Sequence, residues 1–257
     1  MKCIHPDNIT SLSANLEDTN YPDDNLLNKS PKKCWKSTGN TGIITIASTQ
    51  SSGICIAKTN AITMSISLTA GGASLELASG LELAAGLELN PDTAAADVEV
   101  NLSETAGENS VFATWSERST SHTVVITLAA ETGDILQVGA VTVGDVLLWP
   151  DPIKQYSETF QDYSIEKELN NGALYYRQRD IVREFSGTII VNRKSDTEHD
   201  FYDFMNIYKQ IGKNPIGWMM SDISGGEWVV FGRFEYIPKG VHIKDKSRIN
   251  YNVIEVL

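Results

Sequence analysis

Arginine and aromatic residues are interleaved in one short part of the sequence, at Tyr175, Tyr176, Arg177, Arg179, Arg183, Phe185 and Arg193. Arginine and tyrosine are enriched where protein interfaces bind most strongly, because each side chain offers both contact area and hydrogen bonds. The pattern therefore indicates a docking surface. An ordinary solvated strand face, with the arginines balanced by Asp180 and Glu184, is the alternative that this spacing leaves open.

Aromatic residues are also frequent in this half of the chain as a whole. Residues 150–257 contain 16 of the 21 aromatic residues, which is more than the core of a domain of that size needs. We therefore expect some of these rings on the surface, in strands that also carry arginine. The predicted assembly interface consists of Tyr175, Tyr176, Arg177, Arg179, Trp228 and Arg233. On this interpretation, residues 150–257 hold the main contacts of a cyclic homo-oligomer or ring.

The residue patterns of catalysis are missing from the sequence. None of the motifs GxSxG, HExxH, GxxxxGK[ST] or GxGxxG occurs. The four histidines are isolated from one another, and we expect each to be a surface or structural residue: His5, His122, His199 and His242. We therefore predict no catalytic residue, no cofactor and no enzymatic activity. An enzyme is kept as a third interpretation, because many folds host activities that leave no linear motif.

Metal-binding and disulfide patterns are equally weak. Three cysteines, Cys3, Cys34 and Cys55, are widely spaced, odd in number and without a CxxC pair, so we expect free thiols and no zinc site. Asp23 and Asp24 could contribute to a calcium loop, but the spacing of a calcium-binding cage is absent. The prediction is that the protein has no metal site.

Composition and charge restrict the class of partner. The chain has 257 residues, of which 41% are hydrophobic and 21% charged, as in a soluble globular protein. Its net charge of -12 argues against nucleic acid as a partner, because binding phosphates requires clustered cations. Apolar runs such as residues 146–149 are far shorter than the roughly 18 residues of a membrane span, and we predict no such span and no secretory signal.

The two halves of the chain differ in composition, which predicts two domains, residues 1–149 and 150–257. Residues 1–149 hold 7 Lys and Arg against 17 Asp and Glu, whereas residues 150–257 hold 14 against 16. Pro150 and Pro152 lie at the junction, where they remove two backbone donors and favour extended chain. A helix is therefore not expected to cross the boundary.

The first half has the period-two pattern of half-buried strands. Ile62, Met64, Ile66 and Leu68 alternate with polar residues, and residues 124, 126 and 128 are apolar in the same way. This pattern predicts an antiparallel β-sandwich or jelly roll. Between these strands, residues 75–90 contain three LEL hexapeptides, which we interpret as a sheet-edge excursion or hairpin, with a helix as the competing interpretation.

The second half is predicted to be α+β, with one helix on a sheet. Phe201, Phe204, Met205, Tyr208 and Ile211 recur at helical intervals, and Ser195 and Glu198 have the spacing of a capping box. Strand-like segments precede the helix at 173–193 and follow it at 215–222, 226–237 and 247–257. All of these segments are expected to form the sheet of the second domain. The predicted fold is thus mainly β, with a jelly-roll sandwich followed by an α+β domain.

Residues 25–46 resemble the opening of galactose-binding-like, discoidin-type jelly rolls. In that family an NLLD-like turn is followed by W-x-S and a first core strand. The matching residues here are Asn25, Leu26, Leu27, Trp35, Ser37 and Thr38. Asn28 stands where the family usually has aspartate. The resemblance implies a jelly roll that recognises sugar in some members.

The layout from residue 138 onward, with Arg-rich strands, one helix and the segment GWMMSD, looks like that of tail-tip proteins of long, non-contractile-tailed bacteriophages. These proteins append a jelly roll to a tail-tube-like domain. The LEL hexapeptides have no counterpart in that pattern. The resemblance implies a virion component, assembled in the bacterial cytoplasm, that forms a ring at the distal tail and contacts the tube, hub and tape-measure proteins.

Two functional hypotheses of different classes follow. The leading one is a structural subunit of a phage tail tip, held by its neighbours through residues 150–257. The alternative is a carbohydrate-binding adhesin that recognises host surface glycans through the first domain. Sugar recognition uses exposed aromatic platforms, and Tyr21 and Trp115 are the candidates, because Trp35 and Trp149 are expected in or beside the core. The scarcity of aromatic residues in residues 1–149 favours the structural interpretation.

Overall fold

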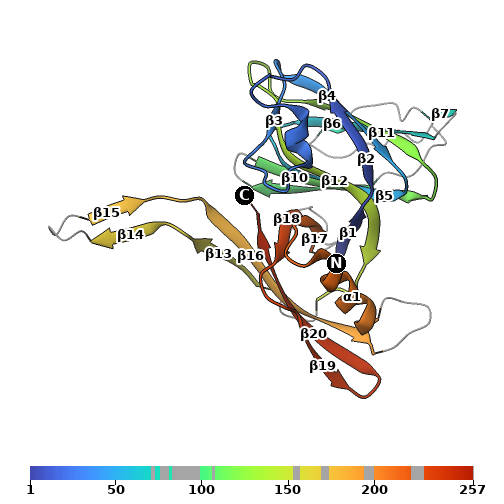
Figure 1. The fold of residues 1–257 in the computed structure, drawn as a ribbon, viewed down its shortest axis with the longest axis vertical. Coiled ribbons are helices and arrows are strands. Elements are labelled where there is room, and N and C mark those ends of the chain that lie inside the picture. The colour runs from blue at the N-terminus through green and yellow to red at the C-terminus, as the bar shows by residue number, and fades with distance from the viewer. Residues whose placement is uncertain are drawn as a thin grey trace. The chain divides into compact units, whose positions relative to one another are not determined.

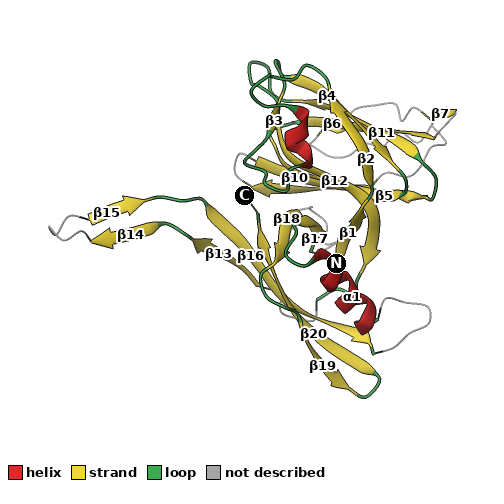
Figure 2. Ribbon diagram, in the orientation of Figure 1, coloured by secondary structure: helices red, strands yellow, loops and turns green. Residues whose placement is uncertain are grey.

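The protein is described by a computed structural model, which covers residues 1–70, 73–75, 81–82, 99–105, 108–152, 157–168, 174–193, 200–220 and 229–256. The chain forms two compact units. Unit 1 consists of Met1–Leu148 and Ile216–Phe231, and unit 2 consists of Trp149–Pro215 and Gly232–Leu257. Figure 1 labels the elements of both units, and Figure 2 shows that strands predominate in each of them. The predicted mainly β fold is confirmed.

Unit 1 contains two antiparallel sheets. The first has the order β17 (Ile216–Met219), β1 (Lys2–Asp7), β12 (Gln137–Leu148), β5 (Ser51–Thr59), β10 (Glu108–Arg118) and β9 (Glu99–Thr105), with β3 (Trp35–Lys36) on β12. The second has the order β2 (Ile9–Ala14), β4 (Thr41–Ser48), β11 (His122–Ala129), β6 (Thr63–Ala70) and β7 (Ala73–Leu75), with β8 (Leu81–Glu82) on β6.

Eight strands of unit 1 follow the order of a jelly roll. Numbered from one to eight along the chain, they are β1, β4, β5, β6, β7, β10, β11 and β12. The first sheet then reads one, eight, three, six, and the second reads two, seven, four, five. Successive strands therefore cross from sheet to sheet, except the fourth and fifth, which pair in the second sheet, as in two nested Greek keys, and the predicted jelly roll is confirmed.

The core of unit 1 lies between the two sheets. Ile54, Val111 and Val141 contribute from the first sheet, and Ile46 and Ile126 contribute from the second. In β11, Val124, Ile126 and Leu128 are buried while the residues between them are not, as the alternation predicts. Most of the LEL stretch lies outside the described residues, apart from the short strands β7 and β8.

Residues 216–231 correct the predicted domain organisation. The chain leaves unit 1 one residue before the predicted boundary after Trp149, and Ile216–Phe231, which follows that boundary in the sequence, belongs to unit 1. β17 pairs with β1, with Lys2 opposite Met219 and Cys3 opposite Trp218. All four residues of β17 are buried. The composition of the two halves could not indicate this return, because an apolar strand does not show in its own sequence which unit it joins.

Unit 2 is built on the strand order β13 (Ser157–Asp162), β16 (Ile181–Asn192), β20 (Lys246–Glu255) and the second half of β18 (Val229–Phe234), with β19 (Lys239–Ile243) paired to β20. β14 (Ile165–Glu168) and β15 (Leu174–Arg177) form a separate two-stranded ribbon. β16 and β20 pair over nine residues, from Glu184 opposite Ile254 to Asn192 opposite Lys246. The pairings of β13 with β16, of β14 with β15 and of β16 with β20 are all antiparallel.

Helix α1 (Phe201–Ile211) packs by an aromatic face within unit 2. The Phe204 ring lies edge-on to Trp149 at 4.9 Å and to Phe234 of β18 at 6.0 Å. Asp200 caps the helix: its carboxylate accepts the backbone N–H groups of Tyr202 and Asp203. The capping box therefore begins at Asp200 and not at Ser195. Among the described residues, no helix is long and apolar enough to cross a membrane.

The burial of Cys55 predicts how the thiols react. Burial raises the pKa of Cys55 to about 12, and Cys3 is buried as well, whereas Cys34 is partly exposed. Since the thiolate is the nucleophile, iodoacetamide at pH 8 is expected to modify Cys34 alone in the native protein and all three thiols in urea. Peptide mass mapping measures this. Native modification of Cys55 as fast as that of Cys34 would contradict the buried position of β5.

The return of residues 216–231 to unit 1 gives a second prediction. When residues 1–149 and 150–257 are co-expressed as separate polypeptides, they are expected to copurify, because the second supplies β17 to unit 1. A Cβ atom on Gly217 would lie 2.2 Å from the Cβ of Cys55, so Gly217→Val in the second polypeptide is expected to reduce copurification at least tenfold. Lys239→Val, at an exposed position of strand β19 in the same polypeptide, is the control for a general effect of valine.

Independent purification of the two polypeptides, each folded and monomeric, would show that residues 216–231 do not bind unit 1. If the Gly217→Val polypeptide copurifies with residues 1–149 as well as the unchanged polypeptide does, β17 does not pack against β5.

Candidate functional site

Many of the exposed large apolar side chains of unit 2 lie on a long β-ribbon, which we call the arm. It comprises residues 157–168 and 174–183, and its end, formed by β14 and β15, is called the arm tip. Figure 1 shows β13 and β16 leading away from β20 toward this tip. β13 pairs with β16 from Ser157 opposite Ser186 to Asp162 opposite Ile181. In the described part of the chain, β14 and β15 pair only with each other.

A bulge separates the tip from the rest of the arm. Asp162 pairs with Ile181, but the next pair is Ile165 with Arg177, so two residues on one strand face three on the other. The hydroxyl of Ser164 accepts the backbone N–H of Arg179 at 3.0 Å. The Ser164 backbone N–H donates to Asp162 Oδ1 at 2.8 Å, and hydrogen bonds from Ser164 hold the pKa of Asp162 below its usual value. These bonds fix the bulge.

Large apolar side chains are exposed along the whole arm: Phe160, Tyr163, Ile165, Leu174, Tyr175, Tyr176 and Ile181. Leu174 is 68% exposed and Phe160 is 66% exposed. A two-stranded ribbon has no third layer on which to bury them, and such ribbons are marginally stable alone in water. Both backbone edges of the tip are also open, which is a surface that other chains can bind.

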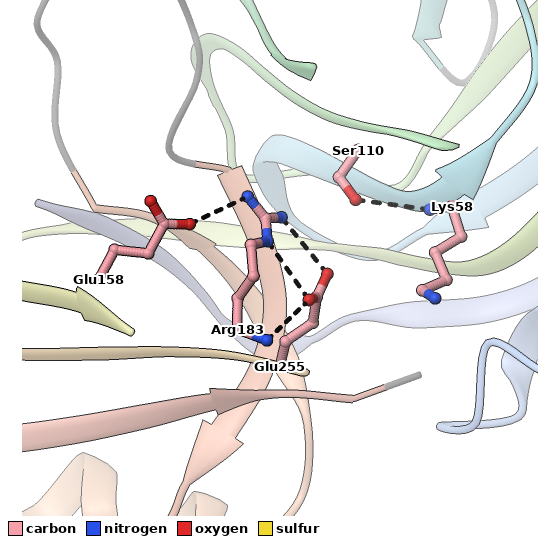
Figure 3. Close-up of polar contacts among 5 residues, drawn as sticks. All are labelled: Lys58, Ser110, Glu158, Arg183 and Glu255. Atoms are coloured by element: carbon pink, nitrogen blue, oxygen red, sulfur yellow. Dashed lines mark hydrogen bonds and ion pairs between the residues drawn. The ribbon is translucent and has the colours of Figure 1, made fainter. Parts of the chain in front are cut away.

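A buried ion pair anchors the base of the arm (Figure 3). Arg183 of β16 and Glu255 of β20 have side chains that are 6% and 9% exposed. The Arg183 Nε donates to Glu255 Oε2 and its Nη2 donates to Glu255 Oε1, both at 3.3 Å. The backbone N–H of Arg183 also donates to Oε2. The arm is therefore attached to β20 by a bidentate pair, placed where the ladder between β16 and β20 ends.

Glu158 of β13 completes this cluster from the other strand of the arm. Its Oε1 lies 3.8 Å from Arg183 Nη1. Burial raises the pKa of Glu158, the charge of Glu255 raises it further, and Arg183 opposes both effects. Arg183 thus neutralises two carboxylates but is bound closely to only one of them. Glu255 is the residue on which the position of Arg183 depends.

The predicted assembly residues fall into three groups. Tyr175, Tyr176 and Arg177 lie together on the arm tip, and Arg179 follows in the bulge; all four are exposed. Arg233 lies elsewhere, on β18 opposite Ile254, at the sheet from which the arm extends. Trp228 lies outside the described residues. The spacing of arginine and aromatic residues therefore located the tip, but it did not reveal the exposed Leu174, Ile165 and Phe160.

The two candidate glycan platforms are not open rings. Trp115 is only 5% exposed, packs in the core of unit 1, and donates its indole N–H to the Ser51 carbonyl at 3.2 Å. A stacking platform must be exposed, so this prediction is wrong for Trp115. Tyr21 is 37% exposed, but the Lys36 ammonium lies over its ring at 4.2 Å. A sugar would have to displace this cation.

A serine and histidine pair was missed by sequence reasoning. Ser51 Oγ lies 2.7 Å from His122 Nε2, and His122 Nδ1 lies 2.8 Å from the Thr120 carbonyl oxygen. This geometry would suit a nucleophile and its base, but Ser51 is fully buried and His122 is 4% exposed. Because β5 and β11 belong to different sheets, the pair links the two layers of the jelly roll. Its residues are 71 positions apart, so no local spacing could indicate it.

The segment that resembles galactose-binding-like domains folds around buried Leu26 and Trp35. Asp23–Leu27 forms a 3-10 helix, and Asn25 Nδ2 donates to the Cys34 carbonyl at 3.0 Å. The Asp23 carboxylate accepts the backbone N–H of Ala14 at 2.9 Å, which gives it a structural role. Across the described residues, no cluster of three or more His, Cys, Asp or Glu side chains could hold a metal ion.

Comparisons of the chain with protein-family models, with curated proteins and with solved structures found no match.

The ion pair at the base of the arm gives a stability prediction. Glu255→Gln removes the carboxylate charge that lies against the buried Arg183 guanidinium, so the free energy of unfolding is expected to fall by about 3 kcal/mol. Urea denaturation at pH 7 measures it. An unchanged midpoint would mean that Arg183 does not depend on Glu255.

Glu158→Gln is the matched variant, and we do not expect it to lower the free energy of unfolding at pH 7. Because the pKa of Glu158 is raised in the folded state, its charged form disfavours folding, and this cost develops as pH rises above the ordinary value of 4.5. The glutamine variant is therefore expected to equal or exceed the parent in stability at pH 7, and to lose that advantage below pH 4. Destabilisation as large as that of Glu255→Gln would show that Arg183 depends on both acids.

Proposed function

We propose that the protein is a structural subunit of a bacteriophage tail tip, and that it assembles into a ring through unit 2. The observation that carries the proposal is the arm tip, an exposed ribbon with two open edges. Leu174, Tyr175 and Tyr176 stand on it at 68%, 48% and 59% exposure. Side chains of this kind are the usual anchors of protein interfaces, and an assembled partner supplies the missing layer.

The distribution of exposed rings supports assigning assembly to unit 2. Among the described residues, the exposed aromatic side chains are Tyr21, Phe160, Tyr163, Tyr175, Tyr176, Tyr202 and Tyr236. Six of these seven belong to unit 2, and four of the six are on the arm. Unit 1 by contrast buries Trp35, Phe112 and Trp115. The aromatic excess of the second half thus lies largely at its surface, where it is available to neighbouring subunits.

The assignment to a phage tail tip rests on the order of the two folds along the chain. A jelly roll joined to a smaller sheet with one helix resembles the layout of tail-tip proteins. In this proposal, copies of the chain form a ring at the distal tail, and the tube, hub and tape-measure proteins are its other partners. Unit 1 then decorates the ring. The protein would reach the virion after assembly in the bacterial cytoplasm.

Removing the apolar side chains of the tip tests the role of the arm. The variant Leu174→Ser, Tyr175→Ser, Tyr176→Ser is expected to sediment as a monomer at concentrations where the parent chain assembles, with a loss of at least tenfold in association constant. A matched variant removes exposed apolar residues outside the arm: Tyr236→Ser, Val241→Ser, Ile243→Ser. It is expected to assemble like the parent. If the variant at residues 174–176 assembles like the parent while the variant at residues 236, 241 and 243 stays monomeric, the arm is not the interface.

Immunogold labelling tests the location. Antibodies against unit 1 are expected to bind long-tailed particles released by the bacterium that encodes the chain, at the tail end opposite the capsid. Electron microscopy locates the gold. Label on the capsid, or particles without label beside a positive immunoblot of the lysate, would reject the tail-tip assignment while leaving self-assembly intact.

A further inference from the structure

The two faces of the arm tip carry opposite charges. In an antiparallel pair, directly opposed residues point to the same face. The pairs Ile165 with Arg177 and Lys167 with Tyr175 therefore form one face, which we call the basic face. The pairs Glu166 with Tyr176 and Glu168 with Leu174 form the other, which we call the acidic face.

Each face combines two like charges with two apolar side chains. The basic face has Lys167 and Arg177 beside Ile165 and Tyr175, and all four are exposed. On the acidic face, Glu166 and Glu168 stand beside exposed Leu174 and Tyr176. None of the four charged residues makes an ion pair with any residue that the structure describes. The ribbon itself keeps its cations and its carboxylates on opposite sides, so neither face can neutralise its own charge.

We infer that the arm tip binds the tip of a second copy of this chain face to face, the basic face of one on the acidic face of the next. This contact would bring two cations against two carboxylates and cover apolar side chains on both ribbons. Sheets pack face to face at about 10 Å, a distance that lysine, arginine and glutamate side chains span. The inference rests on the proposed function, because it requires the arm to be the interface.

The charge arrangement also determines the symmetry of the assembly. A two-fold contact joins the same surface on both subunits, so it would place basic face on basic face or acidic face on acidic face. Either contact brings four like charges together as apolar surface is removed from water, which is unfavourable. A contact of the basic face of one tip with the acidic face of the next is a head-to-tail contact. Such contacts leave one face free at each end and propagate, and they give a ring when the rotation between subunits closes and an open filament when it does not.

Charge reversal on one face at a time tests the inference in the full chain. Glu166→Lys, Glu168→Lys makes both faces basic, and Lys167→Glu, Arg177→Glu makes both faces acidic. Each variant alone is expected to associate about 100-fold more weakly than the parent, because every face-to-face contact then joins like charges. An equimolar mixture of the two is expected to assemble again, with alternating subunits. Analytical ultracentrifugation measures both, with one variant carrying a fluorophore.

The controls separate face pairing from net charge and from folding. Glu131→Lys, Asp134→Lys changes the net charge as much as the first variant, at exposed positions of unit 1, and is expected to assemble like the parent. Lys239→Glu, Lys246→Glu does the same for the second variant, at exposed positions of unit 2. Circular dichroism and urea denaturation verify that each variant is folded. Raising the salt concentration from 50 mM to 500 mM is expected to weaken assembly of the parent.

Failure of the inference and failure of the proposed function give different results. If single-face variants assemble like the parent, or if their mixture stays monomeric, the tips do not pair by face, and edge-to-edge strand addition becomes the better account. A parent chain that remains monomeric at about 1 mM rejects ring formation by this protein alone, and with it the inference. Assembly that survives the serine substitutions at 174–176 rejects the arm as the interface.

Discussion

A β-strand has backbone hydrogen-bonding groups along both edges, which neighbouring strands pair. The number of neighbouring strands also determines how much of its apolar side chains a segment can bury. In unit 2, β16 is paired on both sides at Glu184–Ser186, by β13 and by β20. Beyond Arg183 the ladder with β20 ends, and at the tip only β14 and β15 remain. The arm exists because the sheet narrows from three strands to two. Its exposed rings follow from that narrowing, since a ribbon has no second layer to cover them.

The end of the ladder is also where a buried charge is found. Glu255 reaches Arg183 with its carboxylate and accepts both the backbone N–H and the guanidinium, so the side chain continues the contact that the backbone of β20 no longer makes. Buried ion pairs add little net stability compared with an apolar pair, but their hydrogen bonds require a fixed orientation of both side chains. Here the pair determines the point at which the arm leaves the sheet. We regard it as the positioning element for a tip that itself makes few contacts.

Much of the predicted site was accessible from the sequence because its signal is local. The interleaving of Tyr175, Tyr176 and Arg177 selected residues that the structure shows to be exposed, while their role as an interface stays a prediction. Trp115 was misassigned although a local signal existed, since it shares a face with Val111 and Ala113, which are buried in the same strand. The Ser51 and His122 contact could not be predicted, because it joins strands of different sheets.

The sequence by itself determined the period-two strands, the helix at 201–211 and the two compositions, because each depends on neighbouring residues only. The strand at Ile165–Glu168, in which Glu166, Lys167 and Glu168 alternate between the two sides, was not predicted and came from the structure. Only the tertiary structure decided that residues 216–231 return to unit 1, since an apolar strand fits any sheet that has an open edge. Only the pairing register decided that the carboxylates share a face with Leu174 and Tyr176. A shift of one residue would have exchanged those partners, and the register depends on the bulge at Ser164 and on the distant contact of Arg183 with Glu255.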